Sequence, residues 1–113
     1  MKWFLSSKIH KATVTKAKLK YVGSITIDKE LLDLVGIEEG EKVLVTSFTF
    51  GSRLETYVIS GRSGFGEICM NGPTAHLISV GEEIVIMGFR LSSKPVKSKK
   101  ILVDKSNKFI KYL

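Results

Sequence analysis

The Gly23–Ser24 pair, in the segment YVGSITID, is the feature of the sequence with the clearest chemical potential. Val22, Ile25 and Ile27 favour a strand, whereas a glycine inside a strand marks a bulge, a bend or a close backbone approach. A serine hydroxyl can attack the carbonyl of the preceding residue, and the resulting ester can eliminate, which cuts the chain and leaves a pyruvoyl group. Glycine tolerates the unusual conformation that such an attack needs. The pair is either an ordinary bulge or a site of self-cleavage, and cleavage also requires hydrogen-bond donors near the Gly23 carbonyl.

Four short motifs with polar or reactive side chains follow one another along the chain. They are Lys8-Ile9-His10, Tyr21-x-Gly23-Ser24, Arg53-x-x-Thr56-Tyr57 and Asn71-Gly72. Taken singly, each has a structural explanation as a surface lysine, a strand residue or a turn. Taken together, and with the segments SITID, TYVI and VGEEIVIM, they resemble the pyruvoyl-dependent aspartate 1-decarboxylases from about Lys8 to about Phe89.

The resemblance implies a fold, an assembly and a maturation reaction. The family has a mainly β fold, a small six-stranded double-psi β-barrel with short helices, and forms homotetramers with active sites between subunits. We therefore expect one domain over residues 1–113 that cuts itself into residues 1–23 and 24–113. The resemblance leaves open whether a maturation factor assists the cut.

The resemblance also implies an activity and a cofactor. Ser24 is expected to become a covalent pyruvoyl group, whose ketone forms a Schiff base with L-aspartate and accepts electrons as carbon dioxide leaves. The product, β-alanine, is used in pantothenate and coenzyme A synthesis. No metal is expected.

Four motif residues receive roles in substrate chemistry from the same resemblance. Arg53, a planar fork for a carboxylate, and Lys8, a compact charge, are expected to hold the dianionic substrate. Tyr57 is expected to protonate the carbon after decarboxylation, and Thr56 to contact the substrate and the carbonyl at the cleavage site. Because successive strand residues face opposite sides, we expect a neighbouring subunit to supply one of Thr56 and Tyr57.

The remaining motif residues are expected to support the site or to bind the substrate through their backbone. The supporting residues are His10, Tyr21, Gly23 and Asn71, and the backbone contacts come from Gly72, Pro73 and Thr74. The family usually has alanines after Asn-Gly, so Pro73, which has no N–H, is a departure. The Thr74 hydroxyl is a possible replacement for the lost donor.

The elements that position these residues are predicted to be short strands around one helix, which favours a small closed barrel. A helix should begin at Asp28, a good N-cap, and end at Gly36, a good C′ residue. Pro73 should begin a short helical turn. The predicted strands are Lys8–Lys16, Ser24–Ile27, Val43–Phe48, Arg53–Ser60, Glu67–Met70 and Glu83–Leu91, with an edge strand over 101–103.

Composition sets limits on the partners and the compartment. Residues 1–20 hold six lysines and no acid, and residues 94–113 hold seven lysines and one acid, whereas the middle of the chain is acidic. Lysine suits a solvated face better than base reading, so nucleic acid is an unexpected partner despite the net charge of +7. No apolar run approaches a membrane span or a secretory signal. The single cysteine, Cys69, is consistent with a reducing cytoplasm.

Two alternatives to an enzyme remain open at this stage. The segment Ser24–Val45 also resembles the swapped-hairpin transition-state regulators, which bind DNA, although those domains are about half this length. Nothing in that resemblance accounts for Arg53 or Asn71-Gly72. A non-catalytic barrel is the third possibility, if Ser24 never reacts. Two fragments on a denaturing gel favour the enzyme, and one intact band that binds DNA favours the regulator.

Overall fold

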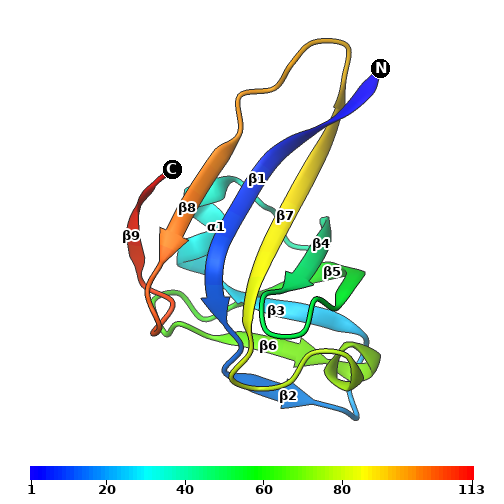
Figure 1. The fold of residues 1–113 in the computed structure, drawn as a ribbon, viewed down its shortest axis with the longest axis vertical. Coiled ribbons are helices and arrows are strands. Elements are labelled where there is room, and N and C mark those ends of the chain that lie inside the picture. Colours follow the sequence, from blue (N-terminus) through cyan, green and yellow to red (C-terminus); the bar gives the residue numbers. More distant parts are fainter.

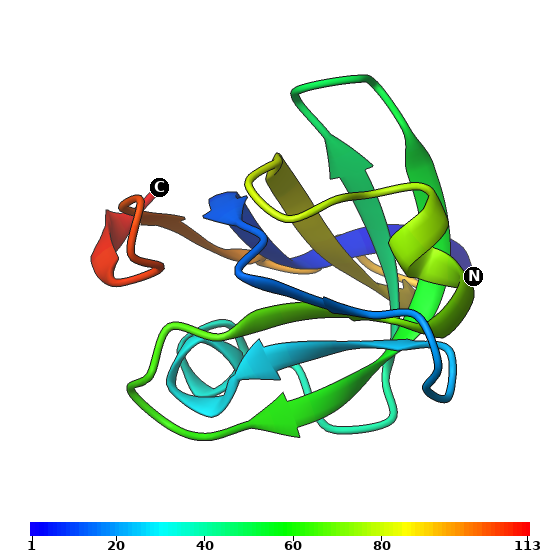
Figure 2. The same cartoon turned by 90° about the horizontal axis from the view of Figure 1, so that it is seen from below.

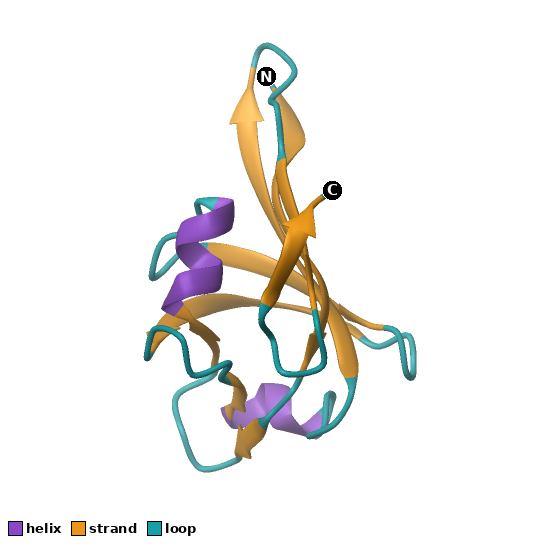
Figure 3. Cartoon of the chain, turned by 90° about the vertical axis from the view of Figure 1, so that its left-hand side faces the viewer, coloured by secondary structure: helices purple, strands orange, loops and turns teal.

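The computed structural model describes residues 1–113 and consists mainly of strands (Figure 1). Its two helices are α1 (Lys29–Val35) and the short 3-10 helix η1 (Gly72–His76), which lie at different ends of the barrel (Figure 3). No helix is long and apolar enough to cross a lipid bilayer. The strands are β1 (Lys2–Thr13), β2 (Lys16–Lys18), β3 (Ser24–Asp28), β4 (Lys42–Ser47), β5 (Arg53–Gly61), β6 (Ile68–Asn71), β7 (Glu83–Ser92), β8 (Lys99–Val103) and β9 (Phe109–Tyr112).

The nine strands form one sheet in the order β2-β6-β3-β5-β4-β7-β1-β8-β9. β5 joins the two halves of this sheet, because its first part pairs antiparallel with β4 and its second part pairs parallel with β3. The chain that leaves β1 closes the barrel, since Val14 and Thr15 bond to the backbone of Glu82 and Ile68 before β2 pairs with β6. In Figure 2 the strands β3 and β6 lie across the interior from β1 and β7.

Branched aliphatic side chains from all parts of the barrel fill its interior. Nineteen buried residues form one cluster, to which β3 contributes Ile25 and Ile27 and α1 contributes Leu31, Leu32 and Val35. β-Branched residues pack well on the pleated surface of a strand, which explains the choice of isoleucine and valine at most of these positions. The core therefore lies between the two halves of the sheet, with α1 covering one opening.

The fold is the mainly β, barrel-like fold that the sequence predicted, with more strands than the six expected. The additional strands are β2, β8 and β9, which arise from the lysine-rich segments near both ends of the chain. The strand predicted over 101–103 is present in β8, but it does not lie at an edge of the sheet, because β8 pairs with β1 on one side and β9 on the other. β9 was not predicted, since all four of its side chains are exposed and give no alternating pattern.

The predicted boundaries of α1 are confirmed. Asp28 caps its amino end by accepting a hydrogen bond from the Glu30 N–H at 2.9 Å, and Gly36 ends it in the left-handed region at φ 75°. The first strand differs from the prediction, because β1 already begins at Lys2 and stops at Thr13. Strong capping chemistry is local in sequence, which is why the helix could be placed more accurately than the strand.

The Gly23–Ser24 bond lies at the entrance of a strand, not within one. β3 begins at Ser24, and the preceding residues 19–23 form a loop. The predicted interruption of a strand by Gly23 was therefore wrong, although the predicted strand Ser24–Ile27 is present. The bond joins a loop residue to the first residue of a buried strand.

The Asp28 carboxylate also fixes the glycine-rich loop 61–66. It is almost fully buried and accepts hydrogen bonds from the N–H groups of Gly64 at 2.9 Å and Gly66 at 2.6 Å, in addition to its bond from Glu30. One side chain thus satisfies three backbone donors on two segments. Its removal leaves the buried Gly66 N–H and two partly buried N–H groups without this acceptor.

We expect Asp28→Ala to lower the free energy of unfolding by about 3 kcal/mol, because one buried and two partly buried N–H groups lose a charged acceptor. Urea denaturation would measure the loss. The matched control is Asp33→Ala, which removes an exposed carboxylate whose ion pair with Lys29 spans one helical turn. That change should cost less than about 0.5 kcal/mol. Equal effects of the two substitutions would contradict this role of Asp28.

Candidate active site

Ser24 lies on a small polar face shared by β3 and β6. In the antiparallel ladder between these strands, Ser24 is opposite Asn71 and Thr26 is opposite Cys69. The alternate residues 25, 27, 68 and 70 belong to the core, so the four polar side chains point to the other face of the sheet. Ser24, Asn71 and Cys69 are nevertheless buried, with 0–1% of their surface exposed. The serine is therefore held in a polar environment inside the protein.

A connected set of hydrogen bonds surrounds the Ser24 hydroxyl. It donates to the Val22 carbonyl at 3.0 Å and accepts from Asn71 Nδ2 at 3.0 Å. Asn71 Nδ2 also donates to Thr26 Oγ1 at 2.9 Å, and Cys69 Sγ donates to Asn71 Oδ1 at 3.2 Å. Thr26 and Cys69 were missed from the sequence. The two-residue period of the strand from Ser24 could have indicated Thr26, but no local signal indicates Cys69.

Gly72 presses closely against the loop that precedes Ser24. Its φ of 63° favours glycine, and a Cβ at this position would lie 2.5 Å from the Tyr21 carbonyl oxygen and 3.0 Å from the Gly23 nitrogen. Gly23 itself does not have a left-handed φ, so the unusual conformation expected there occurs at Gly72 instead. The Tyr21 ring is half-exposed, with Lys18 Nζ 5.6 Å from its centre. The loop and Gly72 together hold the backbone at the expected cleavage bond.

The residues after Gly72 form η1 and place a hydroxyl beside Ser24. Pro73 occupies the first turn of η1, where its missing N–H leaves no unsatisfied donor within the helix. Thr74 is buried, and its hydroxyl lies 2.8 Å from the Asn71 carbonyl oxygen and 3.4 Å from the Ser24 carbonyl oxygen. The shorter contact is the better hydrogen bond, so Thr74 braces the turn between Asn71 and η1.

The predicted residues Lys8, His10, Arg53 and Tyr57 lie on the outer face of β1, β7, β4 and β5. The ladders align Lys8 with Met87, Leu44 and Glu55 across these strands, and Arg53 and Tyr57 lie two residues from Glu55 on either side. Three strand spacings, roughly 14 Å, separate the backbone of Lys8 from that of β5. Arg53 and Tyr57 are exposed, and their side chains make no hydrogen bond or ion pair within the chain.

Thr56 faces the interior, opposite to Tyr57. Its ladder partner is Val43, a core residue, whereas Tyr57 is paired with Lys42 on the outer face. If the parallel register of β3 and β5, which pairs Ile25 with Val58, continues by two residues, Thr56 falls beside Gly23. The Thr56 and Tyr57 side chains point to opposite faces of β5, as the alternation of strand residues predicted. The strand does not bend enough to bring them to one face.

His10 lies in a bulge of β1 that turns it toward the loop after β4. The register with β7 shifts between Ile9 and Ala12, and Lys11 has a φ of 66°, a conformation that residues other than glycine seldom adopt. The His10 ring packs edge-on against Phe48, with 5.4 Å between ring centres. Burial and the charges of Lys8 and Lys11 lower the pKa of His10 below its ordinary value of 6.5, while Glu83 opposes this shift.

A buried carboxylate that was not predicted fixes the turn leading to Arg53. Glu82 Oε1 accepts a hydrogen bond from the Ser47 hydroxyl at 2.6 Å, and Glu82 Oε2 accepts one from the Ser79 N–H at 2.6 Å. The Ser47 hydroxyl also accepts from the Thr49 N–H at 3.1 Å. These contacts hold the 47–52 turn in one conformation, and β5 begins immediately after it.

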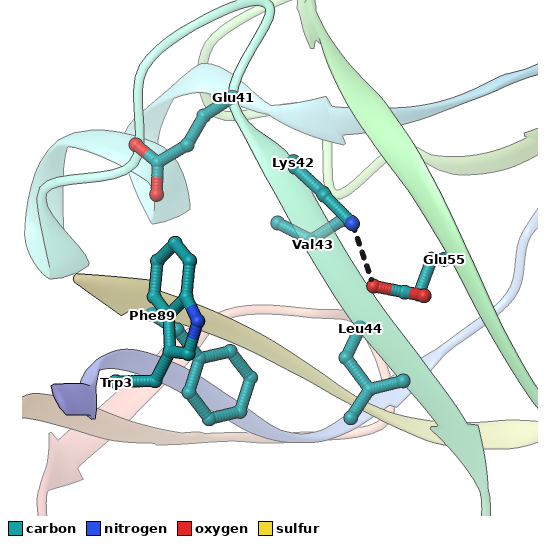
Figure 4. A pocket seen from close by; sticks show the side chains of 7 residues that line it. All are labelled: Trp3, Glu41, Lys42, Val43, Leu44, Glu55 and Phe89. Carbon is teal, nitrogen blue, oxygen red and sulfur yellow. Dashed lines mark ion pairs between the residues drawn. The ribbon is translucent and has the colours of Figure 1, made fainter. Parts of the chain in front are cut away.

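A cavity of about 400 Å³ opens on the same outer face but contains none of the predicted site residues (Figure 4). Trp3, Phe89 and Leu44 give it apolar walls. Glu41 and Glu55 supply carboxylates, and its one cation, Lys42, is already paired with Glu55 at 2.9 Å. A cavity with this charge does not suit a dianionic ligand.

The structure thus divides the predicted residues into two groups. Tyr21, Gly23, Ser24, Asn71 and the Gly72–Thr74 segment come together around a buried serine, whereas the outer-face group makes no hydrogen bond to that network, and Thr56 faces the interior from β5. No three His, Cys, Asp or Glu side chains are arranged to hold a metal ion. The fold and site define a small β-barrel with a hydrogen-bonded, inaccessible serine at the start of a strand.

Comparison with known proteins identifies the family. The family model described as aspartate decarboxylase matches residues 1–110. The aspartate 1-decarboxylase of Caldicellulosiruptor saccharolyticus is 50% identical over 111 residues, covering 95% of this chain and 87% of the relative. That of Thermotoga sp. is 50% identical over 107 residues, covering 95% and 94%. The chain belongs to the aspartate decarboxylase family, and no comparison supports the DNA-binding alternative.

We expect the pKa of His10, followed by NMR over a pH titration, to lie below 6.5. Lys8→Gln should raise this pKa, because removal of a neighbouring positive charge makes the imidazolium less unfavourable. The pKa should remain below 6.5 in the variant, since burial is the larger cause. Lys2→Gln, the same change farther along β1, should leave the value unchanged. If the pKa of His10 is higher in Lys2→Gln than in Lys8→Gln, Lys8 is not the lysine that lowers it.

Proposed function

We propose that this chain is an L-aspartate 1-decarboxylase that first cuts itself between Gly23 and Ser24. The observation that carries the proposal is the buried Ser24 hydroxyl, held between the Val22 carbonyl and the Asn71 amide at the start of β3. Membership of the aspartate decarboxylase family supports the substrate, and the cut gives fragments 1–23 and 24–113. The product is β-alanine, which supplies pantothenate and coenzyme A synthesis.

The proposed cut needs only the atoms of the chain and one water molecule. Ser24 Oγ forms a bond to the Gly23 carbonyl carbon, the bond from that carbon to the Ser24 nitrogen breaks, and the hydroxyl proton passes to the freed amine. The Ser24 Cα–H is then lost as a proton while the Cβ–Oγ bond breaks, so that Gly23 leaves as a carboxylate. Water replaces the nitrogen, which departs as ammonia, and the resulting pyruvoyl group begins the larger fragment.

The surroundings of Ser24 fit this modification. The Ser24 hydroxyl has a donor in the Asn71 amide and has no exposed surface, and Gly72 and the 21–23 loop are packed against each other beside it. A covalent group made from the serine itself needs no additional space. When present, a pyruvoyl ketone captures an amine and accepts the electrons released by decarboxylation. The chain's own residues must then bind the carboxylates and supply a proton.

Arg53, Lys8 and Tyr57 are the residues we assign to those tasks. The guanidinium of Arg53 suits a bidentate carboxylate contact, Lys8 adds a second positive charge, and the Tyr57 hydroxyl donates the proton. Thr56 contacts the substrate and the Gly23 carbonyl, and His10 lines the site. The backbone groups of residues 72–74 complete the substrate contacts.

The separation of Lys8 from Arg53 on one face supports a site shared between copies of this chain. Arg53 and Tyr57 are exposed and unpaired, so they are free to face a second copy. We propose a homotetramer with sites between subunits, in the cytoplasm, where the buried, unpaired Cys69 stays reduced. Whether maturation needs a helper protein is decided by the rate at which the purified precursor cuts itself.

Ser24→Ala should abolish the cut, because it removes the attacking oxygen. Intact mass spectrometry of the wild-type chain should give fragments 1–23 and 24–113, the larger without an amino-terminal amine. The matched control is Ser7→Ala, which removes another buried serine hydroxyl, bonded to Val35. That variant should still be cut. Cleavage of the Ser24→Ala chain at this bond would sink the proposal.

Tyr57→Phe and Arg53→Ala should cut themselves normally but form β-alanine about 10²-fold or more slowly, because each loses a contact to the reacting substrate. Single-turnover assays on processed protein would measure the rate of β-alanine formation.

Co-assembly of Ser24→Ala chains with Tyr57→Phe chains tests whether one site is shared between two subunits. If two copies contribute, about a quarter of the sites in mixed oligomers regain both groups. Activity no greater than that of the two parents would place Ser24 and Tyr57 of one site in the same chain.

A further inference from the structure

Thr26 and Cys69 complete the polar face on which Ser24 and Asn71 meet, although neither was expected to have a role. We propose that these two residues position Asn71 for self-cleavage, by holding its amide so that the NH₂ group, not the carbonyl oxygen, faces Ser24 Oγ. The inference rests on the proposed function. It assigns to Thr26 and Cys69 an effect on the rate of the cut, exerted through Asn71.

An asparagine side chain can present either end to a neighbour, so something must select one orientation. Here Asn71 Nδ2 has two acceptors, Ser24 Oγ at 3.0 Å and Thr26 Oγ1 at 2.9 Å, while Oδ1 faces Cys69 Sγ at 3.2 Å. The opposite orientation would place the NH₂ group against sulfur, a weak acceptor. In that orientation the Asn71 side-chain carbonyl would also compete with the Val22 carbonyl for the Ser24 hydroxyl proton.

Cys69 selects the orientation because it remains a donor. Burial raises the pKa of the Cys69 thiol, and the carboxylate of Glu67 raises it further, while Lys18 and Lys16 oppose the shift. The thiol therefore keeps its proton near neutral pH. Its other acceptor, the Met70 carbonyl, is 3.9 Å away, so Asn71 Oδ1 at 3.2 Å is the better partner.

Thr26 fixes the other end of the amide because its own rotamer is restrained. The side chain is β-branched, with one strongly limited rotation about Cα–Cβ. Its methyl group lies against Gly61, where an added Cβ would be only 3.0 Å from Thr26 Cγ2. With the methyl directed to Gly61, the hydroxyl oxygen is left to accept from Asn71.

This orientation matters for the bonds that break during the cut. The N–H group of Asn71 directed at Ser24 Oγ stabilises negative charge on that oxygen. Such charge develops when the Cβ–Oγ bond breaks and the oxygen leaves as part of the Gly23 carboxylate. An Asn71 carbonyl in the same place would repel it.

Pulse-labelling and chase of the full chain in an expression host would measure the first-order conversion of precursor to fragments. Thr26→Val, which keeps the shape and removes the hydroxyl, and Cys69→Ala should each slow conversion about tenfold. Cys69→Ser retains the donor and should stay within about twofold of the wild type, whereas Thr26→Ser, which keeps the hydroxyl but loses the methyl that directs it, should convert at a rate between those of Thr26→Val and the wild type. Thr13→Val is the matched control, since that partly buried hydroxyl makes no hydrogen bond.

A double variant distinguishes positioning of Asn71 by Thr26 from a merely structural role of Thr26. In an Asn71→Ala chain, Thr26→Val should cause no further slowing, because its partner is already absent. Additional slowing there, or a wild-type rate for Thr26→Val and Cys69→Ala, overturns the inference while leaving the proposed function intact. Absence of any cut in the wild-type chain, or a cut in Ser24→Ala, overturns the proposed function itself.

Discussion

The close approach of Gly72 to the Tyr21–Gly23 loop is the constraint on which the arrangement of the site depends. A side chain at residue 72 would overlap the Tyr21 carbonyl, so only glycine allows the loop to lie against β6 and η1. That contact places Asn71 opposite Ser24 at the first pair of the β3–β6 ladder. The hydrogen bonds of the serine, and the burial of the bond before it, follow from this one contact between backbones.

β5 connects this buried site with the outer surface of the barrel. Its inward residues, such as Val58, pack in the core beside β3, while Arg53 and Tyr57 point outward from the same strand. A rigid strand shared by both halves of the sheet holds the two groups at a constant separation. If the register of β3 and β5 continues by one residue beyond Ile25 and Val58, Tyr57 falls beside Ser24, and both side chains point away from the core.

Features with a local cause could be predicted from the sequence, and features with a distant cause could not. Asp28 and Gly36 bound α1 through contacts with adjacent residues, and β3 was predicted from its strand-forming isoleucines. Cys69 gave no signal, because its contact with Asn71 acquires meaning only when β6 pairs with β3. Glu82 likewise reaches Ser47 across 35 residues. The resemblance to a family pointed to Ser24 and Asn71, whereas their polar neighbours Thr26 and Cys69 could be found only from the fold.

The burial of Ser24 gives a physical reason why the proposed cut would come before any reaction with a substrate. In the uncut chain this residue has no exposed surface, so no dissolved substrate can reach it, but the Gly23 carbonyl is an immediate neighbour. Chemistry within the chain is therefore favoured before chemistry on a ligand. A cut at this bond frees the end of the 19–23 loop, in which Leu19, Tyr21 and Val22 are already exposed and gain little from staying in place. The proposed cut would thus loosen the segment next to Ser24 in the same reaction that makes the pyruvoyl group.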